Sequence, residues 1–220
     1  MKKNLPYVIG TALVAILIFV GASMLYKNKA ASDVAATGVA RADAAKLVKD
    51  DSATLGPVMS RLVLVEFLDP ECESCRAMHP FVKNILKDYE GKIRYVVRYM
   101  PFHQNSKLAA TWLEAAAEQG KYWEALDALF LQQPHWAAHG APRPELIPQI
   151  LKSVGVDVAL AAQAKDKPEH AQKVERDRQD GLDVGVTGTP SFFVNGRLLP
   201  QLGDAPLRAL IEEELRSSSN

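Results

Sequence analysis

Leu62-Val63-Leu64-Val65-Glu66-Phe67-Leu68, followed by Asp69-Pro70-Glu71 and then Cys72-Glu73-Ser74-Cys75, is the stretch that decides the fold. Its apolar run has the length of a buried strand and ends in turn residues. After the cysteines, apolar residues recur at helical spacing: Met78, Val82, Ile85, Leu86 and Tyr89. The sequence therefore predicts that both cysteines lie between a buried strand and the first turn of a helix.

The N-terminus of a helix favours a thiolate over a thiol, because unpaired N–H groups and about half a positive charge lie there. Two residues separate the cysteines, so both sulfurs fall on the first helical turn, close enough to bond each other. We expect Cys72 to be the exposed attacking thiol and Cys75, one turn deeper, to be the resolving thiol.

A zinc site and a structural disulfide are the alternatives to a redox-active cysteine pair. A zinc site would call for a second pair of cysteines, which the chain lacks, and its histidines show no ligand spacing apart from His79, four residues after Cys75. A purely structural disulfide would close so short a loop that it gains little chain entropy. A C-x-x-C pair after a strand is the expected context of redox chemistry, which is the favoured interpretation.

Glu66 is the one charged residue in the apolar run, six residues before Cys72. Burial near the helix start would raise its pKa. Such a carboxylate is able to accept the proton of Cys75 when that thiol attacks a mixed disulfide. The alternative is an edge position that faces water, which the flanking Val65 and Phe67 disfavour.

Four local features carry a family resemblance: the strand with its acidic residue, the Cys72–Cys75 pair, Pro80 in the following helix, and the segment 186–196 with Thr189-Pro190 and Asn195-Gly196. Together they resemble the thioredoxin superfamily, and more closely the DsbA-like thiol:disulfide oxidoreductases of the bacterial cell envelope. Thioredoxin-like helices carry a kinking proline at the place of Pro80. The resemblance extends from about residue 55 to the C-terminus.

The resemblance implies an α/β, thioredoxin-like fold with an inserted helical subdomain, preceded by an N-terminal transmembrane helix or signal peptide. It implies a cis bond between Thr189 and Pro190 beside the cysteines. The residues expected in the catalytic site are Cys72, Cys75, Glu66 and Pro190. The residues expected to bind substrate are Thr189, whose backbone is free to pair with an extended peptide, Glu73 and Ser74.

The expected reaction is thiol–disulfide exchange. In an oxidase the resting form is the Cys72–Cys75 disulfide; a substrate thiolate attacks Cys72, and a second substrate thiol releases the oxidised substrate. The resemblance implies exported protein thiols or disulfides as substrates, and a quinone-linked membrane partner that restores the pair. No organic cofactor and no metal are required.

The residues between the cysteines depart from the family pattern. Better-known oxidases carry Pro and His there, whereas this chain carries Glu73 and Ser74. Because a glutamate repels a thiolate, we expect a higher Cys72 pKa and a less oxidising couple than in the strongest oxidases. An oxidase is the first expectation, and a reductase or isomerase the second.

A different class of function also fits the cysteine pair. Soft thiolates suit Cu(I), so Cys72 and Cys75 would also serve a thioredoxin-like copper-delivery protein. The methionine or histidine clusters expected around such a site are missing, although Met78 is close. An assembly factor that keeps the fold without redox activity is a third hypothesis.

Residues 4–26 carry no charge and follow two lysines. A bilayer core needs about twenty residues, so this stretch is long enough to cross it. A secretory signal cleaved near Gly21-Ala22-Ser23 is the alternative; an uncleaved anchor is favoured because Leu25 and Tyr26 continue the apolar character. Both place the domain in an oxidising compartment. We expect the extracytoplasmic side of the cell envelope, with the inner membrane as anchor through residues 5–26.

The rest of the chain divides by pattern. Residues 103–166 read as helices, with a loop at 133–144, and are too long for a simple connection. Pro168 suits the first turn of a further helix, whose charged face indicates solvent. Asn195-Gly196 predicts a hairpin turn, and Asp204 the start of the last helix. The predicted domains are an anchor or signal at 1–26, a linker at 27–54, a first core part at 55–102, a helical insert at 103–166 and a second core part at 167–220.

The composition adds one exclusion. The 220 residues include 26 Lys and Arg and 26 Asp and Glu, so the net charge is zero at neutral pH. A neutral balance gives no reason to expect a nucleic-acid partner. Only two cysteines are present, so the fold does not depend on structural disulfides.

Overall fold

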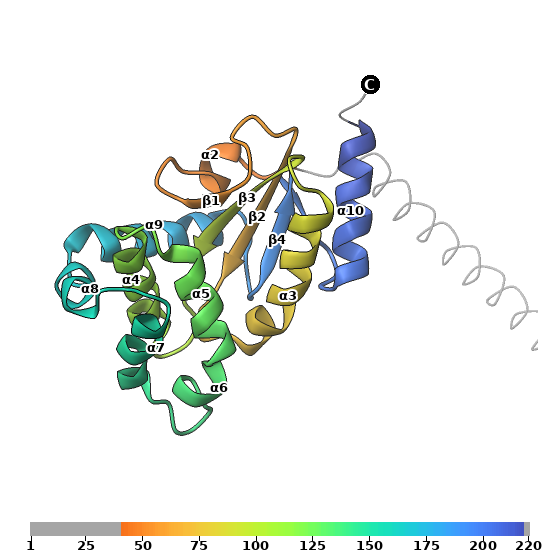
Figure 1. Ribbon diagram of the computed structural model, residues 1–220. Helices are drawn as coiled ribbons and strands as arrows, with labels where there is room; N and C mark the ends of the chain where they lie inside the picture. Colours follow the sequence, from red (N-terminus) through yellow and green to blue (C-terminus); the bar gives the residue numbers. More distant parts are fainter. Residues whose placement is uncertain (1–40, 218–220) are drawn as a thin grey trace, which may run out of the picture. The chain divides into compact units, whose positions relative to one another are not determined.

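Strand β2 (Leu62–Leu68) lies at the centre of a five-stranded sheet in the computed structural model, which describes residues 41–217. The strand order is β1-β3-β2-β4-β5 (Figure 1). β3 (Ile93–Tyr99) runs parallel to β2, while β1 (Ala53–Leu55), β4 (Ser191–Val194) and β5 (Arg197–Leu198) pair antiparallel with their neighbours. β2, α3 and β3 thus follow one another along the chain as a strand, helix, strand unit with a parallel strand pair.

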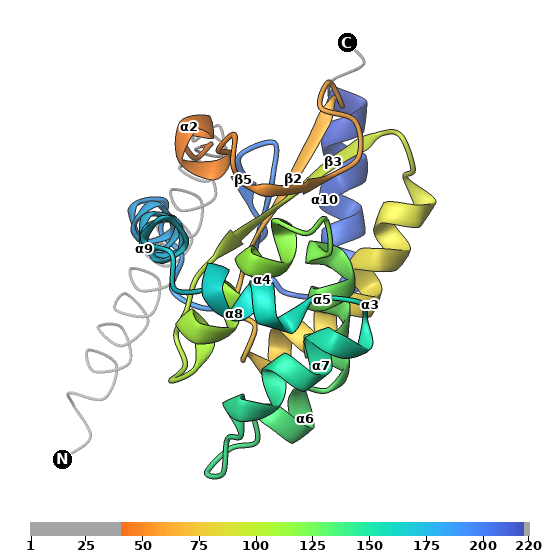
Figure 2. The ribbon, with the colours of Figure 1, turned by 60° about the vertical axis from the view of Figure 1, so that its left-hand side comes forward.

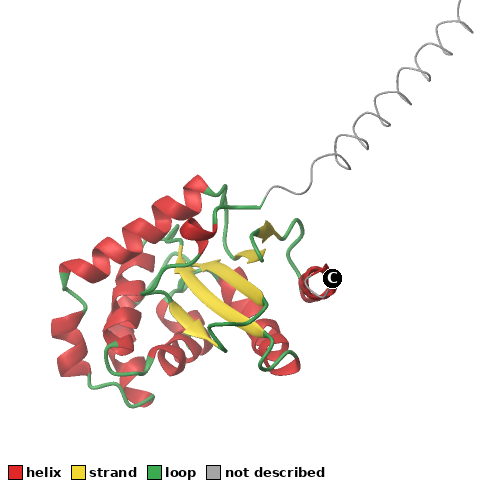
Figure 3. Cartoon of the chain, turned by 90° about the horizontal axis from the view of Figure 1, so that it is seen from above, coloured by secondary structure: helices red, strands yellow, loops and turns green. Residues whose placement is uncertain are grey.

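Helices cover both faces of this sheet. α3 (Glu73–Asp88) and α10 (Asp204–Ser217) lie on one face, and α2 (Ala44–Leu47) and α9 (Pro168–Asp183) on the other (Figures 2 and 3). β2 is therefore buried on both faces, which explains why it reads as a nearly continuous apolar run. Leu64 and Leu68 pack on the α3 side, and Val65 and Phe67 on the α2 and α9 side.

α3 forms as its pattern predicts. Its apolar stripe of Met78, Val82 and Ile85 is buried against the sheet. Pro80 lies inside the helix. The helix ends at Asp88, and Gly91 follows with φ +76°, a conformation that favours glycine in the turn toward β3.

The helical insert lies between β3 and α9 and forms one block beside the sheet (Figure 1). It consists of α4 (Ser106–Ala117), α5 (Tyr122–Leu131), α6 (Gln133–Trp136), a short 3₁₀ helix (Pro144–Leu146), α7 (Ile147–Ser153) and α8 (Val158–Ala164). The predicted loop at 133–144 is wrong at its start, where α6 forms. Trp136 explains this: it is fully buried, and its indole N–H donates to the Leu129 carbonyl at 2.8 Å.

The folded unit begins earlier than predicted. Its first element is α2, where the Asp43 side chain accepts from the Ala45 N–H and Leu47 is buried among Val65 and Phe67. β1 was not predicted, because three residues show no periodicity and the strand exists only through its pairing with β3. Residues 41–54 thus belong to the fold, and the predicted linker 27–54 is too long at its C-terminal end.

The charged face of α9 is a second correction. Asp177 is fully buried, not solvated, and so is Arg98 of β3. The Arg98 guanidinium lies 2.8 Å from Asp177 and 2.7 Å from Asp180, and it donates to the Lys46 carbonyl at 2.6 Å. Charges enter the interior here because each finds partners on α9 and α2.

The hairpin is confirmed. Asn195 and Gly196 both have positive φ, 48° and 86°, between β4 and β5. The Asn195 side chain also accepts a hydrogen bond from the Val63 N–H at 2.8 Å, which ties the turn to β2. α10 follows and starts at Asp204.

The predicted anchor or signal at 1–26, its span at 5–26 and the linker up to residue 40 lie outside the described residues. Within residues 41–217, each helix is too short or too polar to cross a bilayer.

Candidate active site

The two cysteines lie at the start of α3, directly after the carboxyl end of β2. Cys72 immediately precedes the helix and Cys75 is in its first turn. Both are free thiols, so the structure describes the reduced form. Cys72 is 8% exposed and Cys75 0%. Cys72 is therefore the more accessible sulfur, although it is less exposed than expected.

The surroundings shift the pKa values of the two thiols in opposite directions. The pKa of Cys72 is lowered from 9.0 to about 5, chiefly by the hydrogen bond with the Cys75 thiol; burial opposes this, while the Thr189 side chain and the N–H groups of Cys75 and Ser74 add to it. Burial raises the pKa of Cys75 well above 9.0, and the bond to Cys72 and the charge of Glu66 add to that rise. At neutral pH Cys72 is thus a thiolate and Cys75 a thiol.

Thr189 and Pro190 lie beside Cys72. Their peptide bond is cis, and the Cys72 thiol is 3.4 Å from the Thr189 carbonyl oxygen, to which it donates. Pro190 is buried, whereas Thr187 and Gly188 are exposed. The fold brings these two segments together from positions 117 residues apart.

Glu66 is buried beneath the same site, 1% exposed. β2 pairs with β3 on one side and β4 on the other, so the edge alternative is wrong. The Tyr95 hydroxyl donates to the Glu66 carboxylate. Burial raises the pKa of Glu66 to about 7, against the lowering effect of the Tyr95 bond, and the charge of Cys72 adds to the rise. Its role as proton acceptor for Cys75 stays a prediction.

Glu73 and Ser74 lie on the exposed surface of the first helical turn. Ser74 acts on Cys72 through its backbone N–H. The Glu73 side chain is 59% exposed, and its carboxylate is 3.5 Å from Nε2 of His139. Its charge is therefore largely solvated. The Glu73 carboxylate is not among the groups with the largest effects on the Cys72 pKa.

Asp69, which the sequence pattern did not single out, holds the turn between β2 and α3. Its backbone N–H donates to Cys75 Sγ at 3.4 Å, and its carbonyl accepts from the Cys72 N–H at 3.0 Å. Its buried carboxylate accepts from the loop after β3, including His103 Nδ1 at 2.7 Å and Ser106 Oγ at 2.5 Å. Its place directly after a buried strand is the sequence signal that could have identified it.

Gln133 of α6 connects the insert to the same turn. Its buried side chain donates to the carbonyls of Pro70 at 2.9 Å and Cys72 at 3.0 Å, and accepts from Arg76 Nε at 3.0 Å. No local pattern marks this residue, because its partners lie about sixty positions away.

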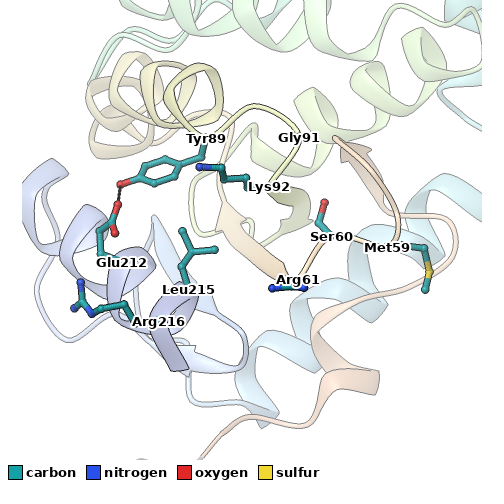
Figure 4. Close-up of a pocket in the computed structure, with 9 residues that line it drawn as sticks. All are labelled: Met59, Ser60, Arg61, Tyr89, Gly91, Lys92, Glu212, Leu215 and Arg216. Carbon is teal, nitrogen blue, oxygen red and sulfur yellow. Dashed lines mark hydrogen bonds between the residues drawn. The ribbon is translucent and has the colours of Figure 1, made fainter. Parts of the chain in front are cut away.

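A cavity of about 620 Å³ lies at the other end of β2 (Figure 4). It is bordered by the turn before β2, the end of α3 and the last turns of α10, and the Tyr89 hydroxyl bonds Glu212 at 2.5 Å beside it. It contains none of the residues of the thiol site. Among residues 41–217, no group of three or more His, Cys, Asp or Glu side chains is arranged to hold a metal ion.

Comparison with curated proteins gives relatives of two kinds. Disulfide bond formation protein D of Bacillus subtilis is 26% identical over 170 residues, which cover 74% of this chain and 76% of that protein. The Na(+)/H(+) antiporter NhaA of Herminiimonas arsenicoxydans is 35% identical over 164 residues. The chain spans only 25% of that antiporter's length, and similarly small shares of the other antiporter-named relatives.

Solved structures share the fold over nearly their whole length. BdbD from Bacillus subtilis, in its oxidised form, has a TM-score of 0.69 at 23% identity and covers 81% of this chain and 97% of its own. A thioredoxin-like oxidoreductase from Silicibacter pomeroyi DSS-3 has a TM-score of 0.69 at 25% identity, covering 80% and 99%. Wolbachia pipientis alpha-DsbA1 has a TM-score of 0.70 at 18% identity, covering 78% and 94%.

The family model described as Thioredoxin matches residues 49–213, from just before β1 into α10. This span contains the sheet, the helical insert, the cysteine pair and the Thr189–Pro190 segment. With the thiol site of a disulfide oxidoreductase at the start of α3 and a DsbA-like helical insert beside it, this chain belongs to the thioredoxin family.

Proposed function

We propose that this protein is an extracytoplasmic thiol oxidase, which passes a Cys72–Cys75 disulfide to the thiols of exported proteins. The observation that carries the proposal is the position of Cys72 at the start of α3, beside the cis Thr189–Pro190 bond, where the Cys75 thiol and the N–H groups of Cys75 and Ser74 lower its pKa to about 5. These donors act on the thiolate, which exists only in the reduced form. They therefore stabilise the product of oxidase chemistry relative to the disulfide.

The size of this effect follows from the Cys72 pKa. A pKa lowered from 9.0 to about 5 leaves the thiol ionised at pH 7. Relative to a thiol of ordinary acidity, the reduced form then gains about 3 kcal/mol at this pH. For a two-electron couple this is about 60 mV in the oxidising direction. In thioredoxin, whose cysteine pKa is about 7, this stabilisation of the reduced form at pH 7 is much smaller, and the proposal therefore favours an oxidase over a reductase or isomerase.

The exchange proceeds in two steps. A substrate thiolate attacks Cys72 Sγ of the disulfide and releases the Cys75 sulfur as the leaving group, which then takes up a proton. A second substrate thiolate attacks the substrate sulfur of the mixed disulfide and releases the Cys72 thiolate. In this proposal Glu66, whose pKa is near 7 and whose charge acts on Cys75, exchanges that proton.

The segment before Pro190 fits an extended peptide. The Thr189 carbonyl accepts only from the Cys72 thiol among the described residues, and the Thr189 N–H bonds no other described backbone group. When Cys72 is ionised it no longer donates, so both Thr189 groups are available to pair with a substrate backbone. Glu73 and Ser74, exposed next to Cys72, would then contact the substrate.

Partners and location follow from the same proposal. An oxidase leaves each cycle as a dithiol, so a redox partner must reoxidise it; a membrane protein in the same envelope is the proposed one. Residues 5–26 would anchor the domain to the inner membrane. The names of the disulfide-forming relatives agree with this assignment.

The redox potential of the pair, measured by equilibrium with glutathione, tests the direction of exchange. Thioredoxin, with a cysteine pKa of about 7, has a potential of about −270 mV, and DsbA, at about 3.5, has about −120 mV. With a Cys72 pKa of about 5 we expect about −190 mV. With a disulfide-containing peptide, the Cys72 thiolate of the Cys75→Ser variant is expected to attack one peptide sulfur, release the other as a thiol, and accumulate as the mixed disulfide because no second cysteine resolves it. Cys72→Ser is expected to be inactive. A potential at or below that of thioredoxin would make the protein a reductase.

A further inference from the structure

His103 occupies a fixed position in the loop between β3 and α4. Its Nδ1 lies 2.7 Å from Oδ2 of Asp69, and its backbone N–H donates to the same oxygen at 3.2 Å. The ring therefore donates through Nδ1 to a buried carboxylate, which fixes its orientation. The side chain remains 36% exposed, so the other ring nitrogen is open to protonation from solvent.

The residue that holds His103 also holds both cysteines. Asp69 donates to Cys75 Sγ and accepts from the Cys72 N–H, as described above. Asp69 thus makes hydrogen bonds with the His103 imidazole, the Cys75 sulfur and the Cys72 backbone. His103 also lines a cavity of about 260 Å³ with Glu71 and His139, next to the first turn of α3.

The charges around His103 are mostly negative. Asp69 and Glu71 lie on the turn after β2 and Cys72 at the start of α3, while His139 faces the cavity from the loop after α6. Burial lowers the pKa of His103, but the hydrogen bond and charge of Asp69, followed by the charges of Cys72 and Glu71, outweigh it and raise this pKa above 6.5. Since the interaction of two charges is mutual, the imidazolium must favour the Cys72 thiolate as much as the thiolate favours the imidazolium.

We propose that His103 is a positioning residue of the thiol site: its imidazolium, held by Asp69, supplies from outside the C-x-x-C motif a positive charge that favours the Cys72 thiolate. Glu73 and Ser74 provide no such charge between the cysteines. The redox couple consequently depends on the protonation of His103, and it becomes less oxidising as this ring loses its proton. This inference rests on the proposed thiol exchange, which it deepens.

The test is the Cys72 thiolate absorbance at 240 nm, followed against pH in wild type and His103→Gln. Glutamine keeps a donor for Asp69 and removes the charge. We expect the acid dissociation constant of Cys72 to fall about fivefold, the effect of one nearby unit charge at a protein surface. His139→Gln is the matched control: it removes an exposed imidazole from the same cavity and is expected to leave the titration unchanged.

A structural role for His103 would give a different pH dependence. If the imidazolium charge acts, the equilibrium constants with glutathione of wild type and His103→Gln differ about fivefold at pH 6, below the raised pKa of His103, and the difference shrinks toward pH 9 as the ring loses its proton. An equal difference at both pH values, or no difference at pH 6, overturns the inference. Exchange that survives unchanged in His103→Gln would still support the proposed function.

A reciprocal measurement needs no variant at position 103. The His103 ring pKa is followed by NMR in reduced wild type and in Cys72→Ser, which lacks the thiolate. Removing the negative charge is expected to lower this pKa by the same fivefold factor in the dissociation constant. A His103 titration that ignores Cys72 refutes the coupling even if His103→Gln does not fold.

Discussion

Replacing Glu66 with glutamine is expected to change how stability depends on pH. Glu66 is fully buried and its pKa is raised from 4.5 to about 7. The folded protein therefore holds this proton more tightly than the unfolded chain does. Its stability is highest below about pH 4.5 and declines as pH rises through about 7, where the buried carboxyl ionises.

The magnitude follows from the two pKa values. Each tenfold change in a dissociation constant is about 1.4 kcal/mol, so the rise from 4.5 to about 7 corresponds to about 3 kcal/mol lost between pH 4 and pH 8.5. Glu66→Gln has no proton to lose and can still accept the Tyr95 hydroxyl bond. Its free energy of unfolding, relative to that of wild type, should therefore rise by about 3 kcal/mol over this range.

Urea denaturation of both reduced proteins at pH 4, 5.5, 7 and 8.5 measures this difference. Groups that titrate independently of Glu66 cancel between the two proteins, and repeating the comparison in a Cys72→Ser background removes the one charge that acts on Glu66 and titrates in this range. Glu114→Gln is the control: Glu114 is also buried, but Lys173 lies 2.7 Å from it, so its neutralisation leaves a buried ammonium without its carboxylate partner and destabilises at neutral pH. A stability difference between wild type and Glu66→Gln that stays flat from pH 4 to 8.5 would refute the reasoning.

The same variant tests the chemical role of Glu66. A carboxylate that exchanges a proton with Cys75 speeds that step by at least about a hundredfold. In Glu66→Gln, the rates at which the Cys72–Cys75 disulfide opens and closes should therefore be about a hundredfold lower, which rapid-mixing experiments measure. An unchanged rate would leave Glu66 with an electrostatic effect on stability alone.

Three further predictions concern other parts of the structure. Glu73→Gln should lower the Cys72 pKa by only about 0.3, because the Glu73 carboxylate is well exposed; thiolate absorbance measures this. Gln133→Ala removes two bonds to the thiol turn and should cost about 1–3 kcal/mol in urea denaturation, with faster alkylation of Cys72. Asp177→Asn leaves the buried Arg98 poorly compensated and should cost about 3–5 kcal/mol, seen as a lower urea midpoint.

Each of these has an outcome that contradicts it. An unchanged Cys72 pKa in Glu73→Gln removes the argument that this glutamate weakens the oxidant. Gln132→Ala, at the neighbouring residue without a side-chain bond to the turn, is the control for Gln133 and should be neutral. Asp183→Asn is the control for Asp177 on α9: it breaks an exposed pair with Lys46 of α2 and should likewise have little effect. A similar loss in control and variant would contradict the specific contacts.

The elements with a strong local pattern were predictable. β2 and α3 follow from an apolar run and a helical stripe, and the hairpin from Asn195-Gly196. The cysteine pair was placed correctly because its neighbours in sequence are also its neighbours in space. β1 escaped prediction because three residues carry no periodicity, and its formation depends on β3.

Contacts between residues far apart in the sequence limit how much of the site can be predicted. His103 lies 34 positions after Asp69, and Gln133 61 positions after Cys72, so no spacing rule connects them. The sequence pattern predicted that the charged face of α9 lies in solvent, because the partner of its buried acidic residues, Arg98, is far away in the sequence, on β3. The local pattern thus located the cysteine pair at the start of α3 but not the residues that contact it.

Arg98 and its acidic partners also constrain how this family member can change. Losing any one of Arg98, Asp177 or Asp180 leaves an interior charge uncompensated, whereas exchanging all of them for well-packed apolar side chains can be neutral or even stabilising. Substituting these residues one at a time therefore produces proteins of low stability. We therefore expect these three positions to covary among homologues, either all ionic or all apolar. The contact between α9 and the sheet should then change at all three positions together.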